Sequence, residues 1–343
     1  MVIFAEPLAQ STRSEILEWR FPKPYHNYVL TGRSRAAWHT SFVIPQLNLL
    51  LDAGLCVNNL RPKHIFLTHG HSDHTLLAPA FGNREDPPDV FCPAEMETVF
   101  NTFCQARTLL NMGGLITADD INSSLPSDSE TEDTPPPTKP PPPSKKGGTP
   151  ALDNAPKPSS NPLIRHNTHP IRPGDTVPLR RTHNISATAF PCDHTIPCVG
   201  YLFSQTTLKL LPQYTSLPGP ELRRLRQEAG VTITGPVTTP IFAFLGDGTA
   251  STLLSEPRWL KDGVPVVITE CSFLYEEHRR QAEKTKHTLW GDLEGVVKKW
   301  KGTTFVVTHF SLRYSEEEVR GFFRKKGEEG GLENLVVWCD GGE

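Results

Sequence analysis

The chain has 343 residues, 37% of them hydrophobic and 21% charged, so it can bury a sizeable core as one large domain or two ordinary ones. A formal net charge of −3 excludes bulk basicity as the basis of nucleic-acid binding, which would need a local patch. No stretch approaches the length of a transmembrane segment, and the N-terminus lacks the basic segment and apolar core of a signal peptide. We expect a soluble protein of the cytoplasm or nucleus, with no membrane partner.

The cysteines are odd in number and scattered, and none forms a Cys-x-x-Cys pair. They are Cys56, Cys92, Cys104, Cys192, Cys198, Cys271 and Cys339. This pattern indicates neither a disulfide framework nor a thiolate zinc site, and it favours a reducing compartment.

The first third of the chain alternates strand and helix signals. Residues 41–51 are typical of a strand pair that ends in the turn Asp52-Ala53-Gly54, and residues 65–68 of a buried strand. Apolar residues at helical spacing predict a helix over 95–112. A strand, a turn and a helix in this order indicate an α/β protein.

The turn after residues 65–68 holds His69, His71, Asp73 and His74 within six positions. Neutral imidazole and carboxylate groups bind Zn²⁺ and neighbouring first-row metals. Alternation along an extended segment would point His69 and His71 the same way, while the following turn lets Asp73 and His74 address a second point. The motif therefore predicts a site for one metal ion or two. The alternative, a polar turn with chance histidines, is much weaker because this spacing rarely arises without purpose.

Residues 123–162 have a different character, with the run PPPTKPPPPSKK at 135–146 among Ser, Thr, Asp and Glu. Almost nothing in this segment can be buried, so we predict a disordered insertion with polyproline II character. An SH3-like partner is a weaker alternative to an unselective insertion. The globular pattern resumes afterwards without a second domain signature, so we predict one domain over residues 1–343.

Five predicted strands follow the insertion, and most of them end close to a ligand-type residue. They cover residues 185–190, 199–204, 241–245, 264–269 and 304–308, and the residues at their ends include His194, Asp247, Glu270 and His309. Sheets of α/β proteins assemble sites from distant sequence at their strand ends. We therefore expect these side chains to complete the site begun by the histidine motif.

A dinuclear site can be counted from these candidates. His69, His71 and His194 would bind one ion, Asp73, His74 and His309 the other, and Asp247 would bridge them. Asp247 lies between two glycines, so a simple turn is the alternative for it. Zn²⁺, Mn²⁺ and Fe²⁺ all suit such a ligand set.

Three further residues are candidates for supporting roles. A carboxylate at Asp52 can accept a hydrogen bond from a ligand imidazole, although a turn cap before Gly54 is an equal alternative. Glu270 and His287 can form a carboxylate–imidazole pair that protonates a leaving alkoxide.

Several of these motifs together resemble the metallo-β-lactamase fold and, within it, the short form of the ribonuclease Z family, the tRNA 3′-processing endonucleases. The resemblance rests on the 69–74 motif, on Asp52-Ala53-Gly54, on Phe244-Leu245-Gly246-Asp247, on Thr269-Glu270-Cys271-Ser272 and on Thr308-His309-Phe310-Ser311-Leu312-Arg313-Tyr314. The last of these is the most discriminating. The resemblance covers most of the chain outside the insertion and the two ends.

The resemblance implies an αββα sandwich of two stacked mixed sheets flanked by helices, with two Zn²⁺ ions at one edge. It implies the ligand grouping counted above, a role for Asp73 in orienting or deprotonating the attacking water, and a proton-donating pair of Glu270 and His287. The implied reaction is attack of a metal-bound hydroxide on precursor tRNA, which releases the 3′ trailer. Homodimerisation is a further expectation of the family.

Residues 209–240 resemble the substrate-binding arm of short ribonuclease Z proteins. Arg223, Arg224 and Arg226 on a short helix can contact tRNA phosphates, and Arg313 is a fourth RNA-binding candidate. The alternative for the helix is a solvated basic face.

Two other functions stay open from the sequence. One is a hydrolase of the same fold that acts on a small phosphodiester, ester or thioester, and it is favoured if the basic arm is dispensable. The other is a non-catalytic RNA-binding subunit, which is weakened because all seven ligand candidates are present.

Overall fold

The structure is a computed structural model that describes residues 2–8, 16–57, 60–82, 86–111, 166–180, 182 and 184–341. The predicted proline-rich insertion, 123–162, and with it the SH3-like partner, lie outside the described residues. No helix in the described part of the chain is long and apolar enough to cross a membrane.

The first sheet is mixed and has the strand order β8-β7-β6-β5-β4-β3-β2. Its β2 to β5 part is antiparallel, and β5 to β8 run parallel. The strands are β2 (Leu17–Arg20), β3 (Val29–Arg35), β4 (His39–Ile44), β5 (Leu49–Leu51), β6 (His64–Phe66), β7 (Asp89–Pro93) and β8 (Asn167–Ile171).

The second sheet is also mixed and has the order β15-β14-β13-β12-β11-β10-β9. Strands β9 to β12 are antiparallel, whereas β12 to β15 are parallel. The strands are β9 (Thr176–Pro178), β10 (Ile185–Cys192), β11 (Cys198–Leu210), β12 (Thr234–Phe244), β13 (Val266–Glu270), β14 (Thr304–Thr308) and β15 (Leu335–Asp340).

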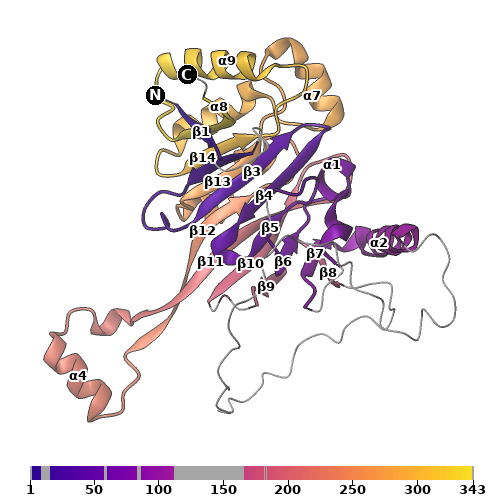
Figure 1. Cartoon of the computed structure of the whole chain (residues 1–343). Coiled ribbons are helices and arrows are strands. Elements are labelled where there is room, and N and C mark those ends of the chain that lie inside the picture. Colours follow the sequence, from indigo (N-terminus) through magenta and orange to yellow (C-terminus); the bar gives the residue numbers. More distant parts are fainter. Residues whose placement is uncertain are drawn as a thin grey trace, which may run out of the picture.

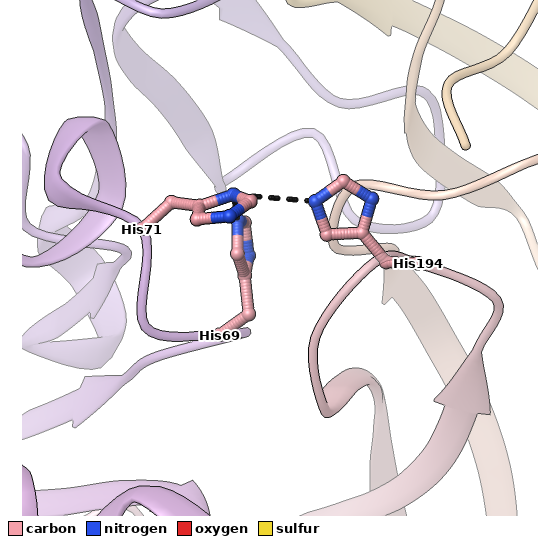
Figure 2. Close-up of side chains that lie close together, drawn as sticks. All are labelled: His69, His71 and His194. Carbon is pink, nitrogen blue, oxygen red and sulfur yellow. Dashed lines mark hydrogen bonds between the residues drawn. The ribbon is translucent and has the colours of Figure 1, made fainter. Parts of the chain in front are cut away.

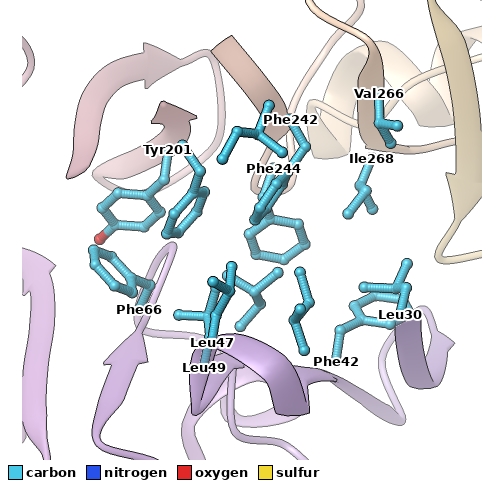
Figure 3. Close-up of a cluster of buried hydrophobic side chains, with 14 of the residues drawn as sticks. Leu30, Phe42, Leu47, Leu49, Phe66, Tyr201, Phe242, Phe244, Val266 and Ile268 are labelled. Atoms are coloured by element: carbon cyan, nitrogen blue, oxygen red, sulfur yellow. The ribbon is translucent and has the colours of Figure 1, made fainter. Parts of the chain in front are cut away.

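Strand β1 (Ile3–Pro7) joins the two sheets, because its first part pairs with β15 and its last part with β2. The two sheets stack on each other, and the largest apolar cluster fills the space between them (Figure 3). Phe42 and Phe66 of the first sheet meet Phe244 and Phe203 of the second in edge-to-face pairs. Packed aromatic rings therefore fix the distance between the sheets.

Helices cover the two outer faces. On the first sheet, Phe100 and Cys104 of α2 pack on Ile65 and Val90. On the second sheet, a cluster that includes Trp290 and Phe323 packs on β13 to β15. The helices are α1 (Ser72–Thr75), α2 (Glu97–Asn111), α4 (Gly219–Gln227), α5 (Ser251–Leu254), α6 (Arg258–Lys261), α7 (Arg279–Thr285), α8 (Trp290–Lys299) and α9 (Glu316–Glu328). Short 3₁₀ turns are η1 (Pro45–Leu47), η2 (Ala78–Phe81), η3 (Ala94–Met96), η4 (Pro212–Tyr214) and η5 (Glu276–His278).

The outer parts of β11 and β12 leave the body as a long hairpin that carries η4 and α4 at its tip (Figure 1). This hairpin contains the predicted arm, residues 209–240. Its two strands are longer than the sequence predicts, since their inner halves belong to the buried sheet and their outer halves form the exposed stem.

The predicted fold class, two stacked mixed sheets flanked by helices, is confirmed. Within the described residues, the helix predicted over 95–112 divides into the 3₁₀ turn η3, directly after β7, and α2. The single-domain boundaries stay a prediction.

Candidate metal centre

The ligand candidates come from four segments that meet at one edge of the stacked sheets. The segment after β6 carries the histidine motif, with α1 beginning at Ser72, while His194, Asp247 and His309 follow β10, β12 and β14. Five of the seven candidate side chains are buried, and His71 and Asp73 are partly exposed. Parallel strand ends thus bring residues 240 positions apart to one place, as expected from the sequence.

The first group consists of His69, His71 and His194, whose ring nitrogens lie close enough together to share one metal ion (Figure 2). His69 Nε2 lies 3.1 Å from His71 Nδ1, and His194 Nε2 lies 3.2 Å from the same atom. These are the three residues that the sequence groups around one ion.

The second group consists of Asp73, His74 and His309. His309 Nε2 lies 3.3 Å from His74 Nε2 and 3.4 Å from Asp73 Oδ2. Asp247 lies between the two groups, because its Oδ2 is 3.8 Å from His69 Nε2 and 3.3 Å from His74 Nε2. The structure therefore brings all seven candidates together, with Asp247 between the two groups, and its bridging role stays a prediction.

Asp52 lies behind both groups, on the side that faces away from the centre. It is completely buried, and its Oδ2 lies 2.7 Å from His74 Nδ1. The Thr68 hydroxyl donates to the same carboxylate and lies 2.9 Å from His69 Nδ1. A carboxylate that accepts the far N–H of a ligand imidazole fixes the ring tautomer, so Asp52 orients His74 directly and His69 through Thr68.

The other two buried imidazoles are held in the same way. His194 Nδ1 donates to the carbonyl of Lys286 over 3.1 Å. His309 Nδ1 lies 3.1 Å from the Ser272 hydroxyl. In all four rings, the nitrogen that faces away from the centre has a partner, which leaves the inward nitrogen free to bind a metal ion.

The electrostatics fit a cation at this place. Burial lowers the pKa of His69 well below its usual value, and it also lowers the pKa of His71 and of His194. Three neutral imidazoles thus face one another with inward nitrogens 3.1–3.2 Å apart. His69 and His194 each have their Nδ1 engaged by an outer partner, so their inward Nε2 atoms can present lone pairs, and this donor set fits a divalent metal ion.

His74 differs from the other histidines because two carboxylates face it. Burial alone would lower the pKa of His74, but Asp247 and Asp52 outweigh it and raise the pKa well above its usual value. For Asp247, His309 and His74 outweigh the effect of burial and hold its pKa well below the usual range. Without an ion, a proton on His74 balances these carboxylates, so metal ion and proton compete for one place.

The predicted pair of Glu270 and His287 is also present. Glu270 Oε1 lies 2.7 Å from His287 Nδ1, and the same carboxylate accepts the N–H of Gly248 and the hydroxyl of Ser272. Burial would lower the pKa of His287, but Glu270 outweighs it and raises the pKa to about 9. His287 therefore carries a proton at neutral pH, next to Asp247 at 3.9 Å.

Strained backbone is concentrated at the centre. Among the described residues, seven non-glycine residues have a positive φ, and four of them are Ala37, Asp52, Lys286 and His309. Each of these four is a ligand candidate or contacts one. Such conformations persist only where the surrounding contacts enforce them, and they gather at functional sites.

The arginines predicted to bind RNA lie in two places. Arg223, Arg224 and Arg226 are exposed on α4 at the tip of the arm, where Arg224 pairs with Glu221 at 2.8 Å. Arg313 lies instead beside the centre, with its guanidinium 5.1 Å from the centroid of the Phe273 ring. Its Nη2 donates to Gln281 Oε1 over 2.7 Å, so this exposed side chain is held in a fixed position.

Besides Thr68 and Lys286, two further contributors to the centre have no role in the sequence interpretation. Ser272 contacts Glu270 and His309, and the N–H of Ala37 donates to Asp73 Oδ2 over 3.0 Å. Ser272 stands two positions after Glu270 within a run that resembles the family, so its place in that run was the available signal. A backbone N–H such as that of Ala37 has no signal in residue type.

Comparison with known proteins finds a matching family model, relatives of similar sequence and solved structures of similar fold. A sequence model of the metallo-β-lactamase superfamily matches residues 51–145. The chain is 26% identical to tRNase Z TRZ2, chloroplastic, of Arabidopsis thaliana over 301 residues, which cover 86% of this chain and 70% of that protein. It is 24% identical to tRNase Z TRZ1 of the same plant over 303 residues, covering 85% and 88%. Among solved structures, human tRNase Z, short form (ELAC1), aligns with a TM-score of 0.46 and 14% identity over 90% of this chain and 95% of that one.

Proposed function

Because the chain has a metallo-β-lactamase fold and resembles tRNase Z proteins over most of its length, we propose that it is a metal-dependent endoribonuclease that processes precursor tRNA. More specifically, we propose two Zn²⁺ ions and removal of the 3′ trailer. The observation that carries the proposal is the convergence of seven ligand-type side chains, in two groups of three with Asp247 between them.

Bound divalent ions would supply Lewis acidity to the scissile phosphate and activate a water molecule. Asp73 would hold one ion and orient the attacking water, and the Ala37 N–H keeps its carboxylate in place. His287 is the proton donor of this mechanism. The Glu270 carboxylate raises the pKa of His287 to about 9, so the imidazole keeps its proton below that pH. In this mechanism His287 delivers that proton to the 3′ oxygen as the P–O bond breaks, which leaves a 3′-hydroxyl on the tRNA.

The arm supports a large substrate. β11 begins next to His194 and runs for 13 residues, a span of about 40 Å, before the chain reaches α4. Only a substrate that extends tens of ångströms from the scissile bond can contact both the metal centre and α4. Exposed Arg223 and Arg226, for which no acidic partner is seen among the described residues, suit contacts with phosphates.

Homodimerisation remains a prediction, and so do the roles of the arm arginines. The choice of Zn²⁺ over Mn²⁺ or Fe²⁺ is part of the proposal, since the donor set suits all three.

The test compares cleavage of a 3′-extended precursor tRNA with hydrolysis of bis(p-nitrophenyl) phosphate. Asp73→Ala should abolish both activities, because both need the metal centre. Arg223→Ala/Arg226→Ala should lower kcat/KM for the tRNA alone. It should also reduce the salt dependence of tRNA binding, since fewer phosphate contacts mean that fewer counterions are released on binding. The matched control is Arg258→Ala/Lys261→Ala, which removes two exposed cations from α6 on the body.

Hydrolysis of the small ester without any cleavage of precursor tRNA would refute the proposed substrate. Equal losses in the α4 and α6 variants would refute the role of the arm while leaving the endonuclease assignment intact.

A further inference from the structure

Two cysteines flank the loop that carries the metal-ligand candidate His194. Cys192 is the last residue of β10 and Cys198 the first residue of β11, and the two are direct partners in the antiparallel register. The five residues 193–197 form the connection between them. The chain therefore places a thiol at each end of a short loop that delivers His194 to the centre.

The geometry of this pair suits a disulfide. Directly opposed residues of an antiparallel pair have Cα atoms about 4.5–5.5 Å apart, within the range of about 4.4–6.8 Å that disulfides span. Opposed residues also share a face of the sheet. The register is unbroken over eight pairs up to Cys192 and Cys198.

A small oxidant can reach the pair. Both cysteines line an open pocket of about 410 Å³, together with residues of the 193–197 loop and with Pro93, Glu95 and Pro173. Cys192 is partly exposed, whereas Cys198 is buried behind it. Both thiols are free, so the pair is in its reduced form.

Cys198 of the reduced pair also contacts the turn after β12, which carries the ligand candidate Asp247. The Cys198 thiol donates to the backbone carbonyl of Asp247 over 3.3 Å. At Gly246 a Cβ atom would lie only 2.5 Å from Cys198 Sγ, so the turn before Asp247 packs directly on this sulfur. A change at Cys198 is therefore transmitted to both Asp247 and His194.

We propose that Cys192 and Cys198 form a reversible redox switch that controls metal binding at the centre. With hydrogen peroxide as oxidant, the Cys192 sulfur attacks one peroxide oxygen, and Cys192 becomes a sulfenic acid as water is formed with the thiol proton. The Cys198 thiol then displaces the sulfenic oxygen, which leaves as a second water, and the S–S bond forms. Two thiols are thus oxidised by two electrons and one peroxide is reduced to two waters.

The disulfide changes the centre in two ways. Cys198 no longer has an S–H to donate to the Asp247 carbonyl. The two sulfurs must also approach to about 2.05 Å, which closes the 193–197 loop into a covalent ring and displaces His194. We expect the dissociation constant for Zn²⁺ to rise by about tenfold, the lower end of the change seen when groups that hold metal ligands are removed.

The test uses the full chain loaded with Zn²⁺, treated with hydrogen peroxide and then with catalase. Both cysteines lie on one tryptic peptide, residues 182–209, so the disulfide appears as a loss of two hydrogen atoms from that peptide in mass spectrometry. Zn²⁺ affinity is measured by competition with a chromogenic chelator before oxidation, after it, and after reduction with dithiothreitol. Cys192→Ser should resist the loss of affinity, whereas Cys56→Ser, which removes another partly exposed cysteine, should respond like the unaltered chain.

Failure of the 182–209 peptide to lose two hydrogens, or a disulfide that leaves Zn²⁺ affinity unchanged, would overturn the proposal. A Cys192→Ser protein that loses affinity on oxidation would do the same. These measurements need no RNA, so a failure of the proposed tRNA activity would be recognised separately.

Discussion

Replacing Asp52 by Asn tests whether the buried carboxylate behind the centre orients ligands of both metal ions. The substitution preserves shape but replaces one carboxylate oxygen by an NH₂ group. Asp52 faces only donors: Oδ1 accepts the Thr68 N–H over 2.8 Å, and Oδ2 lies 2.7 Å from His74 Nδ1. Whichever way the amide turns, its NH₂ group opposes one of these donors.

Both orientations of the amide carry a cost. If the NH₂ group faces His74, the ring must take the other tautomer, which puts a proton on the nitrogen meant for the metal ion. If it faces Thr68, a buried N–H loses its acceptor at about 1–3 kcal/mol, and the Thr68 hydroxyl that holds His69 is disturbed. We expect Zn²⁺ affinity to fall by about 10–100-fold, or about 1.4–2.8 kcal/mol.

Chelator competition gives the Zn²⁺ affinity, and urea denaturation of the metal-free chain gives its free energy of unfolding. Asp262→Asn is the matched control, because Asp262 is exposed and forms an ion pair with the exposed Arg258 at 3.3 Å. Undiminished Zn²⁺ affinity in a folded Asp52→Asn protein would show that the carboxylate does not orient the ligands.

Three further predictions concern proton transfer, RNA contact and stability. His287→Ala should lower kcat for precursor tRNA by about 10²–10⁴-fold and remove the alkaline limb of the pH–rate profile. With a pKa of about 9, the native imidazole is protonated below that pH and loses its proton above it. An unchanged alkaline limb in the variant contradicts the assignment. Trp38→Ala should raise KM for RNA and leave KM for bis(p-nitrophenyl) phosphate unchanged, because an exposed indole beside the centre can stack on an RNA base. The Trp38 side chain is 51% exposed and follows Ala37, whose N–H donates to Asp73. Equal effects on both substrates contradict base stacking. Asp89→Asn should lower the free energy of unfolding by about 1–3 kcal/mol at pH 7 in urea titrations, because His169 and Arg180 bind this carboxylate. These partners outweigh the opposing effect of burial and lower the folded-state pKa of Asp89, so its contribution is present above the unfolded pKa and is lost as the pH falls through the folded one; a variant that remains equally destabilised under strongly acidic conditions contradicts this origin.

The ligand candidates could be predicted because residue type and position along the chain were enough to identify them. His69 to His74 form a local motif, and His194, Asp247 and His309 each stand directly after an apolar run that is recognisable as a strand. Parallel strand ends meet at one edge, so residue type and strand end together were sufficient to group them. The comparisons confirm the resemblance to the metallo-β-lactamase superfamily and to ribonuclease Z on which the finer roles rest.

The groups that hold the ligands were harder to predict, because many of them act through the backbone. The Lys286 carbonyl accepts from His194, and the Ala37 N–H donates to Asp73. Any residue offers these atoms, and only a left-handed conformation at Ala37 and Lys286 aims them at the centre. Sequence patterns indicate which side chains are available, but the dihedral angles that direct a peptide group follow from tertiary packing.

Arg35 shows how far this dependence on packing extends. An arginine in a strand is usually expected at the surface, yet Arg35 of β3 is only 5% exposed. Its Nη2 donates to the carbonyls of Ser311 and Tyr314, and its Nη1 pairs with Glu316 at 3.0 Å. The segment after His309 in the second sheet is therefore fixed by a charged side chain from the first. Because a buried guanidinium is tolerated only with such partners, the same contacts that stack the sheets also position the last ligand of the centre.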